Sequence, residues 1–107
     1  MANAFPVQTN QFLYTVQATR PEMLTEGPTE QEAAVIAQHW AYLQNLHQQE
    51  TVVFVGRTLL KDEEGSFGVA VFKAETEDAA FAIMESDPAV QAGVMDAQLF
   101  PFQILLQ

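Results

Sequence analysis

Two side chains of this sequence, His39 and Asp87, stand in surroundings where they could move a proton. His39 shares helical spacing with Ile36 and Leu43, so a helix would project its imidazole from an apolar face. Asp87 precedes Pro88 in the arrangement of a helix cap, which needs only one of the two carboxylate oxygens. If the other oxygen reaches His39, it would hold the imidazole in one tautomer. The two residues could then act together as a general base.

Each of these residues also has a purely structural interpretation. A part-buried histidine is often held in a core by one backbone hydrogen bond, and burial disfavours its charged form unless an acid is near. An aspartate before a proline has a sufficient role as a cap alone. The sequence therefore leaves open whether His39 and Asp87 form a catalytic pair or serve packing and capping separately.

Basic side chains are few, because only four Lys and Arg stand against 14 Asp and Glu. Arg57 lies in an apolar stretch, where an unpaired guanidinium would be costly. Either an internal acid or an anionic ligand should pair with it, and the acidic composition favours the internal acid. We predict Arg57, together with Arg20, as the residues that bind a substrate.

Several classes of site are disfavoured by the sequence. The absence of cysteine removes disulfides, thiolate metal sites and thiol nucleophiles. His47 projects too far around the helix from His39 for the two to share a metal ion as closely spaced histidines do. The glycine-containing stretch 65–68 resembles neither a P-loop nor a dinucleotide fingerprint. We therefore expect neither a metal nor a cofactor.

The net charge of −10 indicates which partners to expect. A negative surface repels phosphate backbones and anionic lipids, so nucleic acid and membrane partners are not expected. The sequence contains no apolar run of membrane-spanning length, and its first residues lack the pattern of a signal peptide. We expect a soluble, cytoplasmic protein.

The pattern of apolar residues predicts one domain over residues 12–107, after an N-terminal segment, 1–11, that is predicted to be unstructured. Thr29 with Glu32 forms a capping box and marks a helix start, and Thr76 caps a second helix. The expected elements are a strand at 12–18, a loop at 20–28, a helix from 29, a hairpin of strands at 52–60 and 67–73, a helix from 76, a short helical turn from Pro88 ended by Gly93, and a strand at 97–106.

This order, βαββαβ, predicts an α+β ferredoxin-like fold, a four-stranded antiparallel sheet with two helices on one face. The strands look apolar on both faces, with Val52 and Phe54 expected on one side and Val53 and Val55 on the other. A wet apolar sheet face would be costly in a domain of this size. We therefore expect a homodimer in which two copies pack sheet to sheet.

Four blocks resemble the YciI-like (YCII-related) family in order and spacing: His39-Trp40-Ala41-Tyr42-Leu43, Val55-Gly56-Arg57-Thr58-Leu59, Asp78-Ala79-Ala80 and Ser86-Asp87-Pro88-Ala89-Val90-Gln91-Ala92-Gly93. The resemblance implies a dimeric α/β barrel and matches His39 and Asp87 to the family's active-site pair. Arg57 stands where many members have proline, and Ala89 stands where an aromatic residue is usual.

The resemblance also indicates the kind of chemistry to expect. One branch of the family is associated with acid/base elimination on a chlorinated aromatic ring, and related barrels include isomerases and cofactor-free monooxygenases. The first hypothesis is a cofactor-independent lyase or isomerase for a small aromatic or enolisable molecule, in which His39 moves a proton, Asp87 orients it and Arg57 holds an anionic or phenolic group. The alternatives are a non-catalytic small-molecule-binding or regulatory module and a purely structural dimer.

Overall fold

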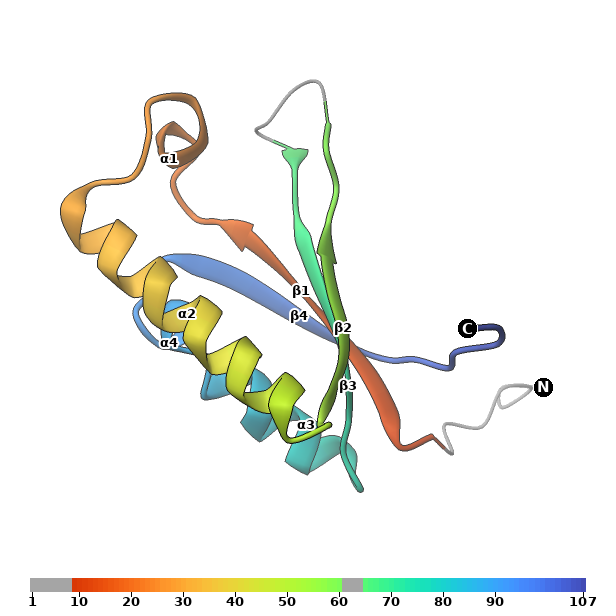
Figure 1. Cartoon of the computed structure of the whole chain (residues 1–107). Coiled ribbons are helices and arrows are strands. Elements are labelled where there is room, and N and C mark those ends of the chain that lie inside the picture. Colours follow the sequence, from red (N-terminus) through yellow and green to blue (C-terminus); the bar gives the residue numbers. More distant parts are fainter. Residues whose placement is uncertain (1–8, 61–64) are drawn as a thin grey trace.

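The computed structural model describes residues 9–60 and 65–107. Its elements, in chain order, are β1 (Gln11–Ala18), α1 (Glu22–Thr25), α2 (Glu30–Gln48), β2 (Val52–Arg57), β3 (Gly68–Lys73), α3 (Glu77–Glu85), α4 (Pro88–Gln91) and β4 (Met95–Pro101). The strands form one antiparallel sheet in the order β2-β3-β1-β4. Helices α2 and α3 lie on the same side of this sheet (Figure 1). The predicted ferredoxin-like α+β fold is confirmed.

The predicted helix starts are confirmed by their capping bonds. Thr29 accepts a hydrogen bond of 3.1 Å from the Glu32 amide, and Glu32 accepts one of 2.9 Å from the Thr29 amide, which completes the capping box of α2. Thr76 caps α3 through the amide of Ala79 at 3.0 Å. These bonds satisfy amides that have no partner inside the helix, so each helix begins at the predicted residue.

Several boundaries differ from the prediction. The segment 20–28, predicted as a loop, contains the single helical turn α1. Strand β2 ends at Arg57 instead of residue 60, and β4 spans Met95–Pro101 instead of 97–106. Most of the segment predicted to be unstructured, 1–11, lies outside the described residues; within the described part, Gln11 already belongs to β1.

An irregularity in β2 changes which side chains share a face of the sheet. Val52 pairs with Phe72 and Phe54 pairs with Val71, although Phe72 and Val71 point to opposite faces. The additional residue, Val53, is a β-bulge, which shifts the alternation by one position. The prediction that Val52 and Phe54 share a face is therefore wrong. Each residue after the bulge, up to Arg57, lies on the face opposite to the one that strict alternation from Val52 predicts.

The core lies between the sheet and the helices. Phe12 and Tyr14 of β1 are almost fully buried on this side, and each packs against Phe72 of β3, with ring centroids 6.1 Å and 5.7 Å apart. Leu43 of α2 and Met84 of α3 close the core from the helix side. Because Tyr14 is buried here, its hydroxyl must find a hydrogen-bond partner within the protein.

The opposite face of the sheet carries exposed aromatic side chains. Phe54 of β2 and Phe100 of β4 are 46% and 43% exposed. Each pairs with an apolar residue of the neighbouring strand on the same face, Phe54 with Val71 and Phe100 with Leu13. Both faces of the sheet are therefore apolar, as the sequence predicts. Within the two described stretches, no helix has the length and apolar composition needed to cross a membrane.

Candidate functional site

Two elements bring His39 and Asp87 together. His39 lies near the middle of α2, on the face turned toward the sheet, and Asp87 is the residue that caps α4. The two residues are 48 positions apart in the sequence, but the Nδ1 atom of His39 lies 2.8 Å from Oδ1 and 2.7 Å from Oδ2 of Asp87. His39 is buried and Asp87 is fully buried. The hypothesis of a core histidine held by the backbone is wrong, because the partner is a carboxylate.

Asp87 accepts hydrogen bonds from three groups. Besides the imidazole of His39, the Ala89 amide donates to Oδ1 at 2.9 Å, and the Tyr14 hydroxyl donates to Oδ2 at 2.7 Å. Asp87 thus caps α4 and contacts His39 at the same time, so the two contacts predicted for its carboxylate coexist. Among the described residues, no buried side-chain polar atom lacks a partner. The carboxylate is held in one orientation.

This network defines the tautomer of His39. Both oxygens of the Asp87 carboxylate accept from protein donors, the Ala89 amide on Oδ1 and the Tyr14 hydroxyl on Oδ2. The Nδ1 atom of His39 must therefore carry the proton that joins it to Asp87, an assignment that follows from the network. In the neutral ring the other nitrogen, Nε2, is then a proton acceptor. Such a ring is prepared to act as a general base.

Tyr14 is a member of this site that the sequence analysis missed. Burial, together with the charge and the hydrogen bond of Asp87, raises the pKa of Tyr14 far above its ordinary value, so its hydroxyl stays a donor. The signal was present in the strand pattern. Tyr14 shares the inner face of β1 with Phe12 and Val16, and a tyrosine buried there needs a polar partner for its hydroxyl. The sequence could not show that the partner is Asp87.

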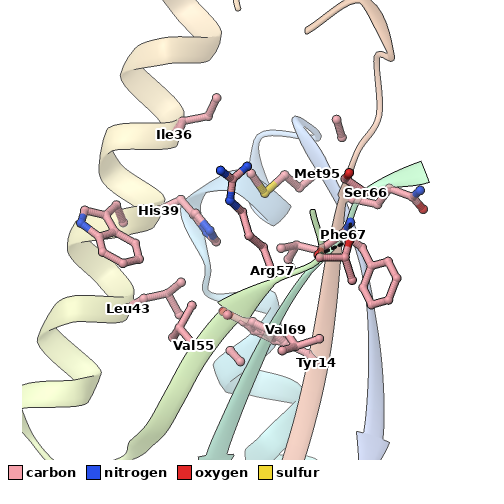
Figure 2. Close-up of a pocket in the computed structure, with 18 of the residues that line it drawn as sticks. Tyr14, Ile36, His39, Leu43, Val55, Arg57, Ser66, Phe67, Val69 and Met95 are labelled. Carbon is pink, nitrogen blue, oxygen red and sulfur yellow. Dashed lines mark hydrogen bonds between the residues drawn. The ribbon is translucent and has the colours of Figure 1, made fainter. Parts of the chain in front are cut away.

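A cavity of about 560 Å³ opens beside His39, between α2 and the inner face of the sheet. Figure 2 shows the His39 ring extending from α2 toward the strands. Most of its wall is apolar, including Met23, Leu24, Ile36, Leu43, Val55 and Met95. A cavity of this size and character is typical of small-molecule sites. The segment around α1, predicted as a loop, contributes to this wall through Met23, Leu24 and Pro28.

The cavity also contains Arg57, the last residue of β2. Its side chain is exposed, and Figure 2 shows it extending from β2 toward α2. Among the described residues, no carboxylate oxygen lies within 4.0 Å of it, whereas Arg20 and His39 both have acidic partners. The internal acid expected from the sequence is thus not found in the described part of the chain. The acidic stretch 62–64 lies outside it.

Arg20 lies outside the cavity wall. Its Nε and Nη2 atoms donate to the two carboxylate oxygens of Glu32, at 2.9 Å and 2.7 Å. The hydrogen bond from Arg20 and that from the Thr29 amide lower the pKa of Glu32 to about 2, and the same pairing raises the pKa of Arg20. The structure therefore brings Arg57, but not Arg20, to the cavity beside His39 and Asp87. The predicted role of Arg20 in substrate binding stays a prediction.

The remaining candidates from the sequence are His47 and a metal site. His47 is exposed near the end of α2 and has no part in the His39 network. Among residues 9–60 and 65–107, no group of three or more His, Asp or Glu side chains could hold a metal ion. The candidate groups that the described residues bring to the site are the oriented imidazole of His39, the buried carboxylate of Asp87 and the guanidinium of Arg57.

Known structures resemble this fold. A 5-chloro-2-hydroxyhydroquinone dehydrochlorinase from Burkholderia phenoliruptrix, solved with 2,5-dihydroxybenzoquinone, matches with a TM-score of 0.60 at 21% identity, over 86% of this chain and 93% of that one. An uncharacterised protein from Thermotoga maritima matches with a TM-score of 0.51 at 15% identity, over 87% and 95%. At these identities the likeness shows the fold alone. A search among curated proteins finds no match.

The sequence comparison identifies the family. The profile of the YCII-related domain matches residues 12–103, which is most of the chain and includes His39, Arg57 and Asp87. The predicted resemblance is confirmed. The chain belongs to the YCII-related domain family.

Proposed function

We propose that this protein is a cofactor-independent lyase or isomerase that uses His39 as a general acid and base on a small molecule. The observation that carries the proposal is the buried contact between His39 Nδ1 and the Asp87 carboxylate, 2.7 Å long, at the wall of a cavity of about 560 Å³. A buried carboxylate fixes the tautomer, so the second ring nitrogen is the one left to accept a proton.

The chemistry follows from the positions of the protons. Nε2 of His39 takes a proton from an acidic C–H or O–H group of the substrate, and the positive ring that forms is stabilised by Asp87. In an isomerase the ring returns the proton to another substrate atom. In a lyase the electron pair left behind forms a double bond and expels a leaving group, and the ring afterwards gives its proton to solvent. Asp87 stays ionised throughout.

Similarity to known proteins supports this choice of reaction. The family is shown by the domain match, and a structure of the same fold is named a dehydrochlorinase, an enzyme that removes HCl from its substrate. Elimination of this kind begins with the removal of a proton by a base. We take a small aromatic or enolisable molecule as the substrate, since such molecules have protons acidic enough for an imidazole.

We also propose that the working form is a homodimer. Phe54 and Phe100 are exposed on the sheet face opposite α2 and α3, and exposed aromatic side chains on one face favour an interface. Sheet-to-sheet packing of two copies would bury this face. The predicted cytoplasmic location stays a prediction.

The alternative is a binding module without turnover. One observation favours it: His39 is buried and its Nδ1 is fully engaged by Asp87, which would also suit a rigid wall residue of a binding site. In that case a ligand would raise the melting temperature without being changed, and His39→Ala would keep this effect.

The experiment that tests the proposal is an NMR determination of the histidine tautomers. The chain has two histidines, so the exposed His47 is an internal control in each spectrum. In the wild type, His39 should carry its proton on Nδ1. In Asp87→Asn the amide can donate to Nδ1, which allows the other tautomer. His47 should be the same in both proteins.

A His39 ring with its proton on Nε2 in the wild type would overturn the proposal, because the base would then be turned away from the substrate. If the tautomer is as expected, the next measurement is proton exchange in D2O. The wild type should exchange acidic C–H protons of enolisable acids with solvent, and His39→Gln should not.

A further inference from the structure

The charges around the cavity differ from those of the whole chain. The chain has 14 Asp and Glu and only four Lys and Arg. Among the described residues that line the cavity, however, there is no Asp, Glu or Lys, and Arg57 is the one arginine. The one other full charge at the site, the Asp87 carboxylate, lies behind His39 and accepts from three protein groups, so it is not part of the wall. Within the described wall, the guanidinium of Arg57 is therefore the group to which an anionic part of a ligand could bind.

Within the described residues, the position of Arg57 leaves its guanidinium without an acidic partner. Arg57 pairs in register with Gly68 of β3, which has no side chain that could cover the guanidinium. Arg57 lies two residues after Val55 and on the same face of β2, and the β-bulge at Val53 places that face toward the cavity. No carboxylate of the described residues lies within 4.0 Å of it. A guanidinium that points across an apolar cavity presents a planar set of donors suited to a carboxylate.

The rest of the cavity defines the other end of the ligand. Ile36, Leu43 and Val55 face the space next to His39, and Trp40 lies on the same helix at the rim. Ile36, Leu43 and Val55 can contact an apolar or aromatic body but offer it no hydrogen bonds, whereas the Trp40 indole has one N–H donor. A ligand that fits both parts has one anionic end and one apolar body.

We propose that the cavity binds a small organic carboxylate, with the carboxylate group on Arg57 and the apolar body between α2 and the sheet, next to His39. This inference deepens the proposed function, on which it rests, by naming the substrate class. Arg57 is then the residue that determines specificity. Neutral analogues of the same shape are rejected because they leave the charge of Arg57 without a partner.

Trp40 makes the binding measurable, since it is the single tryptophan of the chain and lies at the cavity. The probes are matched pairs: benzoate with benzamide, and cyclohexanecarboxylate with its carboxamide. We expect each carboxylate to change the Trp40 fluorescence with saturation at millimolar concentration. Each carboxamide should bind roughly 10- to 100-fold more weakly, which corresponds to the loss of one charge-assisted hydrogen-bonded pair. Equal binding within the pairs, or no saturation by the carboxylates, would overturn the inference.

Variants test whether Arg57 is the responsible cation. Arg57→Gln should weaken carboxylate binding by the same roughly 10- to 100-fold and leave carboxamide binding unchanged, and Arg57→Lys should fall between it and the wild type. Lys73→Gln is the matched control, because it removes the same charge from an exposed position outside the cavity wall. If Lys73→Gln weakens binding as much as Arg57→Gln, the effect is one of net charge and the inference is wrong.

The two proposals fail in different ways. Carboxylate binding that depends on Arg57, combined with a His39 ring protonated on Nε2, would keep this inference and remove the proposed reaction. A His39 ring protonated on Nδ1, combined with equal binding of benzoate and benzamide, would keep the reaction and overturn the carboxylate as its substrate.

Discussion

The hydroxyl of Tyr14 donates a hydrogen bond of 2.7 Å to Oδ2 of Asp87, across 73 residues of sequence. The contact joins the central strand β1 to the cap of α4, and Asp87 in turn contacts His39 of α2. Three elements of the fold thus meet at one buried carboxylate. The orientation of the imidazole therefore depends on the packing of the whole domain, and not on α2 alone.

This contact predicts a measurable contribution of Tyr14 to stability. Tyr14→Phe keeps the ring that packs on Phe72 but removes a donor to a buried carboxylate, so the free energy of unfolding should fall by about 1.5–3 kcal/mol. The control is Tyr42→Phe, which removes a bond to the neutral carbonyl of Ile83 and should cost about 1 kcal/mol. Urea unfolding measures both. Equal losses would show that the charge of Asp87 adds nothing to the Tyr14 bond.

Removal of the carboxylate should destabilise the domain more. Asp87→Ala leaves the Tyr14 hydroxyl, the Ala89 amide and the His39 Nδ1 without their acceptor, so we expect a loss of roughly 3–5 kcal/mol in the free energy of unfolding. Asp87→Asn keeps one oxygen as an acceptor and should lose less. The measurement is again urea unfolding. A loss in Asp87→Ala of only about 1 kcal/mol, the usual effect of a lost helix cap, would mean that the cap is the only structural role of Asp87.

The end of α2 offers a stabilising substitution. Glu50 has a positive φ of 65°. Its amide donates to the carbonyl of His47, and the next amide, that of Thr51, donates to the carbonyl of Leu46. This Schellman arrangement favours glycine, because other residues are strained in the left-handed conformation. Glu50→Gly should raise the free energy of unfolding by about 1 kcal/mol. Gln49→Gly is the control, since φ there is −82° and glycine brings no such gain. A lower melting temperature for Glu50→Gly would contradict the prediction.

The ion pair of Arg20 and Glu32 should make stability depend on pH. The folded protein holds the pKa of Glu32 at about 2, below its ordinary value of 4.5. A carboxyl with a lowered pKa contributes stability that is fully present above pH 4.5 and is lost as the pH falls toward 2. The difference in melting temperature between the wild type and Glu32→Gln should therefore shrink over this range. Gln can still accept from the Thr29 amide, so the helix cap is kept in both proteins and the difference reports the charge of Glu32. A difference that stays constant down to pH 2 would contradict the prediction.

The proposed dimer predicts the effect of charges on the uncovered sheet face. Phe54→Glu and Phe100→Glu place charges on this face and should give monomers in light scattering at concentrations where the wild type is a dimer. Phe81→Glu is a matched control, because Phe81 is 51% exposed but lies on α3, on the helix side of the sheet. A wild type that stays monomeric at all concentrations would overturn the dimer.

Local features of the fold could be predicted because they depend on residues close together in the sequence. The capping box of Thr29 and Glu32 and the cap at Asp87 involve groups two or three residues apart, and their hydrogen bonds are present. Gly93 ends α4 with a φ of 72°, again as predicted. Such signals mark the starts and ends of helices whatever the rest of the chain does.

The faces of β2 could not be predicted in the same way. Whether Val53 forms a bulge depends on how β2 pairs with β3, and strict alternation gives no sign of it. The bulge decides which face Arg57 occupies, and therefore whether its charge reaches the cavity. A feature of the pairing between two strands thus controls a candidate binding residue.

The sequence by itself determined the order of the elements, the caps of the helices and the residue types available for chemistry, His39, Asp87 and Arg57 among them. Only the tertiary structure decided that the Asp87 carboxylate meets both His39 and Tyr14, and that Arg20 is paired with Glu32 while Arg57 lines the cavity. The reason is physical: a cap or a turn is formed within a few residues, whereas the partners of a buried charge come from whichever strands and helices the folded core packs around it.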